Sequence, residues 1–290
     1  ALLAAGAAVQ GVDMLMAGDV DRVFCGVRPP GHHAEHDRAM GFCLFNNIAV
    51  GAAHALEAHG IGKIAILDFD VHQGNGTEEI FADDDRVLFC STFQHPFYPF
   101  TPLLEDAPNR VSVPLNAGAG SAEFRAAVED RWLPALRRFE PEFVFVSAGF
   151  DAHVADDMSH VNLTDKDYEW VTERIMEVAA ASAGGRIVSA LEGGYELHSL
   201  ARCVETHLRV LANEGDAIEA PSGLPALPTA RALWVPRPDF TVAAEAWLGS
   251  EGRLGVGSDS NLRLDPCEEL RLLEFSERLR QGRRDVLADE

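Results

Sequence analysis

Short apolar segments alternate with longer amphipathic segments over residues 1–213. The apolar segments are hydrophobic at successive positions and rich in β-branched or aromatic residues, which is typical of parallel strands buried on both faces. They predict strands at Val23–Val27, Lys63–Phe69, Val87–Ser91, Phe143–Ser147 and Arg186–Ala190. The amphipathic segments predict helices over about 1–18, 44–58, 121–139, 164–182 and 196–212. This alternation predicts an α/β fold with an open, doubly wound, mostly parallel sheet.

Three of the predicted helix ends carry local signals. Ser121 is predicted to cap the N-terminus of one helix, and Thr164 followed by Asp167 resembles a capping box. Gly184 and Gly185 predict the end of the helix that starts near Thr164.

The pattern changes after Gly215. Residues 214–238 include five prolines and show little periodicity, so we expect a linker or extended arm between a domain at 1–213 and an appended segment at 239–290. The appended segment is too small to hold a good core alone.

The charge balance limits the possible partners. The 24 basic and 46 acidic residues give a net charge of −22, which argues against a nucleic-acid partner and leaves cationic or neutral substrates open.

The cysteines and the apolar runs indicate the cellular compartment. The five cysteines show no C-x-x-C spacing, which predicts reduced thiols in a cytoplasmic protein. No apolar run reaches 18 residues, and the opening segment lacks the basic start of a signal peptide, so we expect neither a membrane span nor a leader. An oligomer is compatible with this composition.

Polar side chains follow four of the predicted strands, where an open α/β sheet binds its ligands. In chain order these side chains are His32 and His33, then Asp68, Asp70, His72 and Asn75, then Asp151 and His153, and finally Glu192 and Tyr195.

Asp70, His72 and Asp151 form a candidate metal site. Asp68, Asp70 and His72 are spaced by two, so an extended backbone projects them to one side. Two carboxylates after an apolar strand are costly unless they are neutralised, and three protein ligands leave a metal position open for water, as in catalytic zinc sites. The alternative for the D-x-D-x-H segment alone is a capped strand end with a hydrogen-bonded histidine.

His32, His33 and Tyr195 are candidates for proton transfer and oxyanion stabilisation. The two histidines follow a stiff Pro-Pro-Gly turn, and Asp68 and Asn75 are available to orient them. Tyr195 follows a Gly-Gly pair; taken alone, it is better interpreted as an ordinary surface or core tyrosine.

The segments RPPGHHAEHDRAMGFCLFNNIAV, ILDFDVHQGNGTEEIF, VSAGFDAH and LEGGYEL resemble the zinc-dependent histone deacetylase family, which also includes acetylpolyamine amidohydrolases. The resemblance covers about residues 1–213 and looks most like the class II branch and its bacterial relatives. It implies a three-layer fold shared with arginases. Because a sizeable N-terminal part of the family domain has no counterpart before Ala1, we expect a sheet that is incomplete at its N-terminal side.

The resemblance also implies a role for each matching residue. Asp70, His72 and Asp151 would bind Zn²⁺, His33 would be the general base and acid, and Tyr195 would donate to the oxyanion. His32 paired with Asp68 would act electrostatically, and Asn75 would orient His33. The residues implied for the substrate tunnel are Gly41, Phe42 and Tyr98. A monovalent cation, usually K⁺, would be held by Asp68, Asp70, His72, Ser91 and Thr92.

The chain departs from the family pattern at the tunnel rim and in its tail. Phe100-Thr101-Pro102 replaces a Gly-Thr-Gly turn, and Asp157-Met158-Ser159-His160 replaces Asp-Pro-Leu-Gly, which leaves substrate selectivity open. Arg253–Ala288 resembles a piece of formiminoglutamate deiminase, in which the residue matching Asp259 is a metal ligand. We expect this tail to be catalytically inert; Gly257-Ser258-Asp259 reads equally well as a helix-capping turn.

The leading functional prediction is therefore a zinc hydrolase that removes acetyl groups from lysine side chains or polyamines, with the negative charge suiting cationic substrates. One alternative is a metal-binding but inactive fragment. A second is a manganese ureohydrolase, but that chemistry calls for more bridging carboxylates and gives Tyr195 no role.

Overall fold

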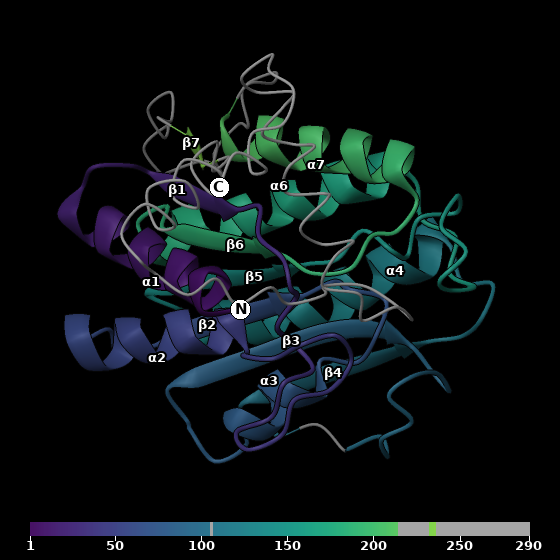
Figure 1. Ribbon diagram of the computed structural model, residues 1–290, viewed down its shortest axis with the longest axis horizontal. Helices are drawn as coiled ribbons and strands as arrows, with labels where there is room; N and C mark the ends of the chain where they lie inside the picture. Colours follow the sequence, from purple (N-terminus) through teal and green to yellow (C-terminus); the bar gives the residue numbers. More distant parts are fainter. Residues whose placement is uncertain (105–106, 214–231, 236–290) are drawn as a thin grey trace, which may run out of the picture. The chain divides into compact units, whose positions relative to one another are not determined.

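The computed structural model describes residues 1–104, 107–213 and 232–235, and its centre is a parallel sheet (Figure 1). Seven strands pair in the order β4-β3-β2-β5-β6-β1-β7, every pairing being parallel. The strands are β1 Arg22–Cys25, β2 Ile64–Asp68, β3 Val87–Gln94, β4 Arg110–Leu115, β5 Phe143–Ala148, β6 Ile187–Leu191 and β7 Ala232–Val235. The predicted α/β fold is confirmed.

Helices cover both faces of this sheet and complete three layers (Figure 1). The helices are α1 Leu2–Ala17, α2 Asn47–His59, α3 Asn75–Ile80, α4 Ser121–Ala127, α5 Leu133–Phe139, α6 Asp165–Ser182 and α7 Leu197–Leu211. Successive residues of β2 enter opposite cores: Ile66 packs on the α1–α2 side, and Leu67 packs on the α4–α7 side. Burial of each such side chain contributes about 1.5–3 kcal/mol, which is why the central strands read as continuous apolar runs.

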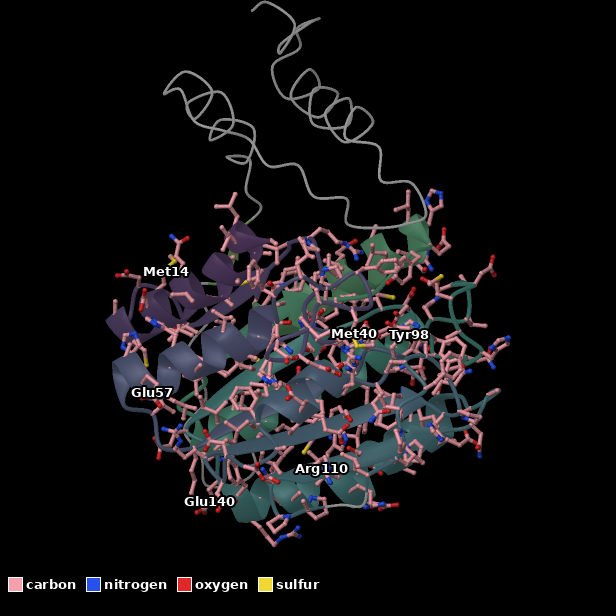
Figure 2. All side chains as sticks on the ribbon, turned by 60° about the horizontal axis from the view of Figure 1, so that its bottom comes forward. Met14, Met40, Glu57, Tyr98, Arg110 and Glu140 are labelled. Atoms are coloured by element: carbon pink, nitrogen blue, oxygen red, sulfur yellow. The ribbon has the colours of Figure 1, made fainter. Side chains whose placement is uncertain are left out.

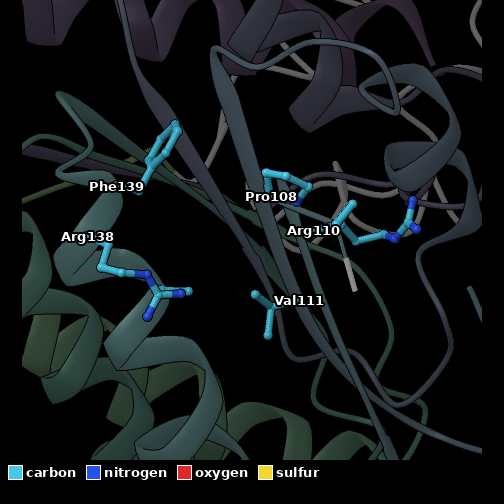
Figure 3. Close-up of a pocket in the computed structure, with 7 residues that line it drawn as sticks. Pro108, Arg110, Val111, Arg138 and Phe139 are labelled. Atoms are coloured by element: carbon cyan, nitrogen blue, oxygen red, sulfur yellow. The ribbon is translucent and has the colours of Figure 1, made fainter. Parts of the chain in front are cut away.

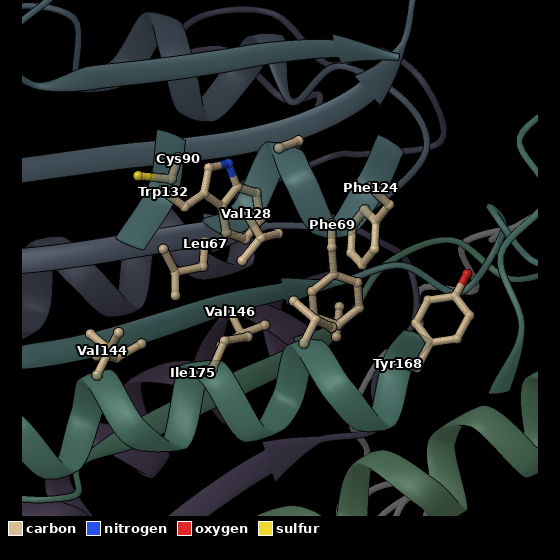
Figure 4. Packing of buried hydrophobic residues seen from close by; sticks show 14 of the residues in the cluster. Leu67, Phe69, Cys90, Phe124, Val128, Trp132, Val144, Val146, Tyr168 and Ile175 are labelled. Carbon is tan, nitrogen blue, oxygen red and sulfur yellow. The ribbon is translucent and has the colours of Figure 1, made fainter. Parts of the chain in front are cut away.

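The core on the α4–α7 side contains the largest buried rings, among them Phe69, Trp132 and Tyr168 (Figure 4). Trp132 belongs to a π-helical turn, Val128–Trp132, that joins α4 to α5. The predicted helix over 121–139 is therefore confirmed in its extent, but it contains a π-helical turn that the sequence analysis did not predict. Phe124, Val128, Trp132 and Leu136 are all buried at a spacing of four, and a turn wider than 3.6 residues keeps this spacing on one face.

The helix-end predictions have mixed outcomes. Thr164 is the N-cap of α6 in a capping box with Asp167, and α6 ends before Gly184 and Gly185, both of which have positive φ, as predicted. The predicted cap at Ser121 is wrong: Gly120 is the N-cap of α4, and the Ser121 hydroxyl donates to the Asp167 carboxylate at 2.7 Å. The Ser121 hydroxyl thus forms a hydrogen bond between α4 and α6 instead of capping α4 as the local sequence pattern predicts.

Three elements of the structure, α3, β4 and β7, were not predicted from the sequence. Helix α3 has only six residues, and β4 contains Pro114, which suits its position at the sheet edge. Strand β7 lies within the predicted linker and pairs with β1. The appended segment at 239–290, its likeness to formiminoglutamate deiminase and Cys267 lie outside the described residues.

Two predictions about the compartment, reduced cysteines and no membrane-spanning segment, can be compared with the structure. Cys25, Cys43, Cys90 and Cys203 are buried and belong to no disulfide, in agreement with the reduced thiols that the cysteine spacing predicts. Across the described ranges, we find no helix that is both long enough and apolar enough to span a bilayer.

One buried histidine of the core lies outside the predicted site. His207 on α7 is fully buried between Thr172 and Ser189, with ring nitrogens 2.8 and 2.9 Å from their hydroxyl oxygens. The Thr172 hydroxyl donates its proton to the Tyr168 carbonyl at 2.6 Å, so His207 Nδ1 carries a proton and Nε2 accepts from Ser189. This network holds a neutral imidazole.

We expect His207 to make the fold acid-sensitive. Burial lowers the pKa of His207 to about 3 from an ordinary value of 6.5. Below pH 6.5 the unfolded chain therefore binds a proton that the folded protein excludes, and stability is lost as the pH falls through this value. Between pH 7.5 and pH 5 the free energy of unfolding should fall by about 2 kcal/mol more in the parent than in His207→Gln. Urea unfolding at both pH values measures the difference, and parallel pH profiles would contradict the prediction.

Candidate active site

The predicted site residues gather at the carboxyl edge of the sheet, after β1, β2, β5 and β6. Strands β2 and β5 are neighbours, with Asp68 paired in register with Ser147, so the loops that follow them are adjacent. Asp70 and Asp151 lie in these two loops and are fully buried. The structure thus brings together two side chains whose positions in the sequence differ by 151 − 70 = 81, at the edge where α/β sheets bind ligands.

Asp70, His72 and Asp151 present three ligand atoms within 4.8 Å of one another (the carboxylate–imidazole trio). His72 Nδ1 lies 3.0 Å from Asp70 Oδ1 and 3.1 Å from Asp151 Oδ2. One N–H cannot serve both carboxylates, and Asp151 Oδ2 is a buried oxygen without a hydrogen-bond partner among the described residues. An orphaned carboxylate oxygen facing an imidazole nitrogen and a second carboxylate fits a divalent metal ion with an open coordination position.

Two glycines allow these carboxylates to approach the backbone. A Cβ on Gly149 would lie 2.1 Å from Asp70 Oδ2, and a Cβ on Gly193 would lie 2.0 Å from Asp151 Oδ2. The Gly193 N–H donates to Asp70 Oδ2 at 2.7 Å, while the Val71 N–H donates to Asp151 Oδ1 at 3.0 Å. These backbone donors leave the remaining oxygens directed into the trio.

The site concentrates buried negative charge. Four carboxyl groups, those of Asp68, Asp70, Asp151 and Glu192, are no more than 1% exposed. Burial raises the pKa of Asp68 to about 6 and that of Glu192 to about 7. Burial, followed by the charge of Asp70, also raises the pKa of Asp151. This density of carboxyl groups favours bound cations, because buried charges are stable only when they are paired.

His33 is oriented by a chain of hydrogen bonds. Its Nδ1 lies 2.8 Å from Asn75 Oδ1, and Asn75 Nδ2 donates to Glu35 Oε1 at 2.8 Å. The carboxylate of Glu35 can only accept, so it fixes the amide with its oxygen toward His33. His33 Nδ1 therefore carries the proton, and Nε2 is left to accept one. Burial, followed by the charges of His32 and His72, holds the pKa of His33 well below its ordinary value.

His32 has the opposite electrostatic character. Its Nδ1 lies 2.9 Å from Asp68 Oδ2, and its ring centroid is 4.1 Å from that of His33. Burial lowers the pKa of His32, but the charges of Asp70 and Asp68 outweigh this effect and hold it well above its ordinary value. The two adjacent histidines are thus set as one cationic ring and one neutral ring, an arrangement typical of acid–base sites.

Tyr195 is half-buried on a loop that is anchored at several points. The Arg28 guanidinium donates to the carbonyls of Glu192 and Gly194 at 2.9 and 3.0 Å. Asp156 Oδ2 accepts from the backbone N–H of Tyr195 at 2.7 Å. Gly194 has φ of +135°, which favours glycine there. Burial, then the charges of Asp151 and Asp70, raise the pKa of Tyr195, so its hydroxyl stays protonated and can donate.

Aromatic rings lie above His33 and His72. Tyr98 meets the His33 ring edge-on, with centroids 5.1 Å apart, and Figure 2 shows Tyr98 beside Met40. Gly41 has φ of +56°, and a Cβ there would lie 2.3 Å from the His33 ring. Phe42 is 42% exposed, and its ring is 6.5 Å from that of Tyr195. These residues form part of an apolar rim around the two histidines.

Ser91 and Thr92 lie within β3, which is the neighbour of β2 opposite β5. Ser91 Oγ is buried without a hydrogen-bond partner in the described part of the chain, while Asp68 Oδ1 accepts the Asp70 N–H at 3.0 Å. The unpartnered hydroxyl of Ser91 and the buried carboxylate of Asp68, which pairs with it in register, are oxygen ligands that could bind a monovalent cation.

Four residues at the site were not assigned roles from the sequence. Glu35 and Asp156 act through Asn75 and the Tyr195 loop, and Arg28 was noted only as part of a motif. Phe97 stacks on His72, with centroids 5.4 Å apart at an interplanar angle of 23°. Only contacts between distant segments reveal these roles. A separate pocket of about 280 Å³ between β4 and α5 contains none of the predicted site residues (Figure 3).

Comparison with known proteins identifies the family. The model of the histone deacetylase domain matches residues 1–211, so the chain belongs to this family. Histone deacetylase 14, chloroplastic, from Arabidopsis thaliana is 40% identical over 224 residues, covering 73% of this chain and 53% of that protein. The chain thus spans about half the length of this curated relative.

Two further relatives differ in their names. Polyamine deacetylase HDAC10 from Homo sapiens is 38% identical over 254 residues, covering 81% of this chain and 37% of that protein. The crystal structure of an HDA15 HD domain matches with a TM-score of 0.68 and 38% identity, covering 72% of this chain and 61% of that chain. Similarity therefore extends to proteins named for histone and for polyamine deacetylation.

Proposed function

We propose that this chain is a zinc-dependent deacetylase that hydrolyses the acetyl amide of an acetylated primary amine, either a lysine side chain or a polyamine. The observation that carries the proposal is the trio of Asp70, His72 and Asp151 beside His33, whose Nε2 is free to accept a proton. Bound by this trio, Zn²⁺ would supply Lewis-acid polarisation of the amide carbonyl and of the attacking water.

One residue, His33, carries out both proton transfers, and its neighbours orient it and set its charge. His33 Nε2 takes the proton of the attacking water, because Asn75 holds the proton of this ring on Nδ1. The same nitrogen then returns the proton to the leaving amine. His32, paired with Asp68, places a charged ring next to the neutral ring of His33 and, after burial, is the largest contributor to the lowered pKa of His33.

Tyr195 stabilises the developing oxyanion through its hydroxyl, since the raised pKa keeps this group a donor. Arg28 donates to the carbonyl of Gly194, and Asp156 accepts from the N–H groups of Tyr195 and Glu196, so the backbone is held on both sides of Tyr195 and the donor is preorganised. Gly41, Phe42 and Tyr98 line the approach for the aliphatic stem of the amine, where an apolar surface excludes water.

K⁺ is proposed to bind behind the trio, and the partnerless Ser91 hydroxyl supports this position. Asp68, with the main chain of Asp70, His72 and Thr92, would complete its oxygen ligands. Its positive charge would offset part of the buried negative charge of this edge.

Turnover of an acetyl-lysine peptide and of an acetylpolyamine by the purified chain tests the proposal. The protein is loaded with Zn²⁺, and zinc content is measured by elemental analysis. We expect hydrolysis that a hydroxamate inhibits, and the ratio of the two kcat/KM values identifies the preferred amine. Stoichiometric zinc in the trio without hydrolysis of either substrate would overturn the proposal in favour of an inactive metal-binding fragment. Hydrolysis of a guanidino substrate instead would indicate a ureohydrolase.

A further inference from the structure

A second group of metal-ligating side chains lies on α1 and α2, away from the candidate active site. The two helices run side by side in the same direction, because Ala8 packs at Gly51 and, further along both, Asp13 contacts His54 and His59. Both helices end just before a strand begins, so this group lies at the opposite edge of the sheet from the trio. Figure 2 shows Met14 and Glu57, which mark these helix ends, well apart from Tyr98.

Three donor atoms converge in this group, which we call the α1–α2 cluster: Asp13, His54 and His59. His54 Nε2 lies 2.6 Å from Asp13 Oδ1, and His59 Nε2 lies 2.8 Å from the same oxygen. The two rings are nearly perpendicular, at 82°, with centroids 5.2 Å apart. The three ligand atoms lie within 4.8 Å of one another, close enough to bind one metal ion together.

The geometry requires only a small adjustment to accept a metal. Ligand atoms around a tetrahedral zinc ion lie about 3.3 Å apart, given metal–ligand distances of about 2.0–2.1 Å. The two present separations are shorter than this and are bridged by protons on the imidazoles. His54 and His59 are about one quarter exposed and Asp13 is 53% exposed, so side-chain rotation can open the group without disturbing the core.

The electrostatic environment also favours a cation. Asp13 lies in the last turns of α1, and His59 is the final residue of α2, so the negative ends of two helix dipoles meet at this point. Hydrogen bonds from His54 and then His59 lower the pKa of Asp13, which keeps it an ionised acceptor. Two imidazoles with one carboxylate suit Zn²⁺ or Ni²⁺ rather than Mg²⁺ or Ca²⁺, which prefer oxygen ligands.

A third group in the described residues, formed by His153, Asp165 and Cys203, shows the contrast. His153 Nδ1 accepts the Ala155 N–H at 3.0 Å, and its Nε2 lies 3.0 Å from Asp165. Arg202 occupies the other Asp165 oxygen at 3.0 Å. Burial raises the pKa of the Cys203 thiol, so it stays protonated. This group is already a satisfied network with its own cation, whereas the α1–α2 cluster has no Lys or Arg paired to Asp13 in any contact of the described residues.

We propose that Asp13, His54 and His59 form a second transition-metal site, which binds Zn²⁺ or Ni²⁺ at neutral pH and cross-links α1 to α2 independently of the candidate active site. Each ring binds the ion through Nε2 as a neutral imidazole with its proton on Nδ1, so the proton now on Nε2 moves to Nδ1 through solvent, or is released to solvent where Nδ1 is already protonated; water completes the coordination. Because the ion binds only where both helices are in place, it stabilises the packing of the first helix by a free energy that rises with the logarithm of its concentration.

Zinc stoichiometry tests the proposal. The intact chain is dialysed at pH 7.5 against buffered free Zn²⁺, and bound zinc per chain is measured for the parent, for His54→Gln/His59→Gln and for Asp13→Asn. We expect the double variant to bind one equivalent less than the parent, with Asp13→Asn weakened at least about tenfold. This difference of one equivalent is expected whether or not the trio binds zinc or supports turnover, so the two proposals fail separately. His198→Gln, which removes another exposed histidine, should match the parent.

A second measurement locates the ion. Ni²⁺ is paramagnetic, so substoichiometric Ni²⁺ should broaden the imidazole proton signals of His54 and His59 in the NMR spectrum before those of His36 and His198. Thermal unfolding should shift upward with Ni²⁺ in the parent and less in the double variant. Equal zinc content in parent and double variant, or broadening spread evenly over the exposed histidines, would overturn the proposal.

Discussion

Gly193→Ala is expected to weaken zinc binding at the trio about a hundredfold and to abolish deacetylation with it. The added Cβ would lie 2.0 Å from Asp151 Oδ2 and 2.6 Å from Asp70 Oδ2, distances that no relaxed structure retains. Both carboxylates must move, and the hydrogen bond from the Gly193 N–H to Asp70 moves with them. Elemental analysis after dialysis, together with turnover, measures the effect.

Gly6→Ala is the matched control for Gly193→Ala. Gly6 lies in α1, and a Cβ there has no atom within 4 Å, so this variant should keep both zinc and turnover. Circular dichroism distinguishes a displaced site from a failure to fold. A folded Gly193→Ala protein with parental zinc affinity would show that the carboxylates of Asp70 and Asp151 do not hold the metal.

Tyr195→Phe is expected to lower kcat about 10²–10³-fold while zinc content stays at the parental level. The hydroxyl is the donor proposed for the oxyanion, and the side chain contributes no atom to the trio. The loss should therefore appear in kcat more than in KM. Steady-state kinetics on the preferred substrate and zinc analysis of the same preparation test both halves of this expectation.

Tyr168→Phe is the matched control, because it removes the same hydroxyl group from a tyrosine to which no catalytic role is assigned. Its hydroxyl is buried and has no hydrogen-bond partner among the described residues, so its removal should leave turnover unchanged. If Tyr195→Phe retained the kcat of Tyr168→Phe, the proposed role of the Tyr195 hydroxyl would be wrong.

Local pattern was sufficient for most of the sheet. The five predicted strands are confirmed to within three residues at their ends, because strands buried on both faces are apolar at most positions. Strand β4 escaped the sequence analysis because an edge strand alternates and tolerates Pro114. The π-helical turn between α4 and α5 was not predicted, since it depends on which residues must face the core around Trp132.

For the candidate site, too, the sequence predicted some contacts, whereas others depend on tertiary packing. The order of strand-end residues was enough to predict that Asp70, His72 and Asp151 meet, and the structure places their ligand atoms together. The orienting contact of His33 with Asn75 and that of His32 with Asp68 also agree with the sequence analysis. Their roles in binding zinc and in catalysis stay predictions.

What the sequence by itself determined is the kind of fold, the edge of the sheet that carries the chemistry and the types of residue placed there. These follow from periodicity and from the rule that parallel strands expose their carboxyl ends at one edge. Only the tertiary structure decided which nitrogen of His33 is free, through Glu35 and Asn75, and which backbone atoms hold the Tyr195 loop. It also brought Asp13 to His54 and His59, because contacts between residues distant in sequence depend on how helices pack and leave no periodic signal in the chain.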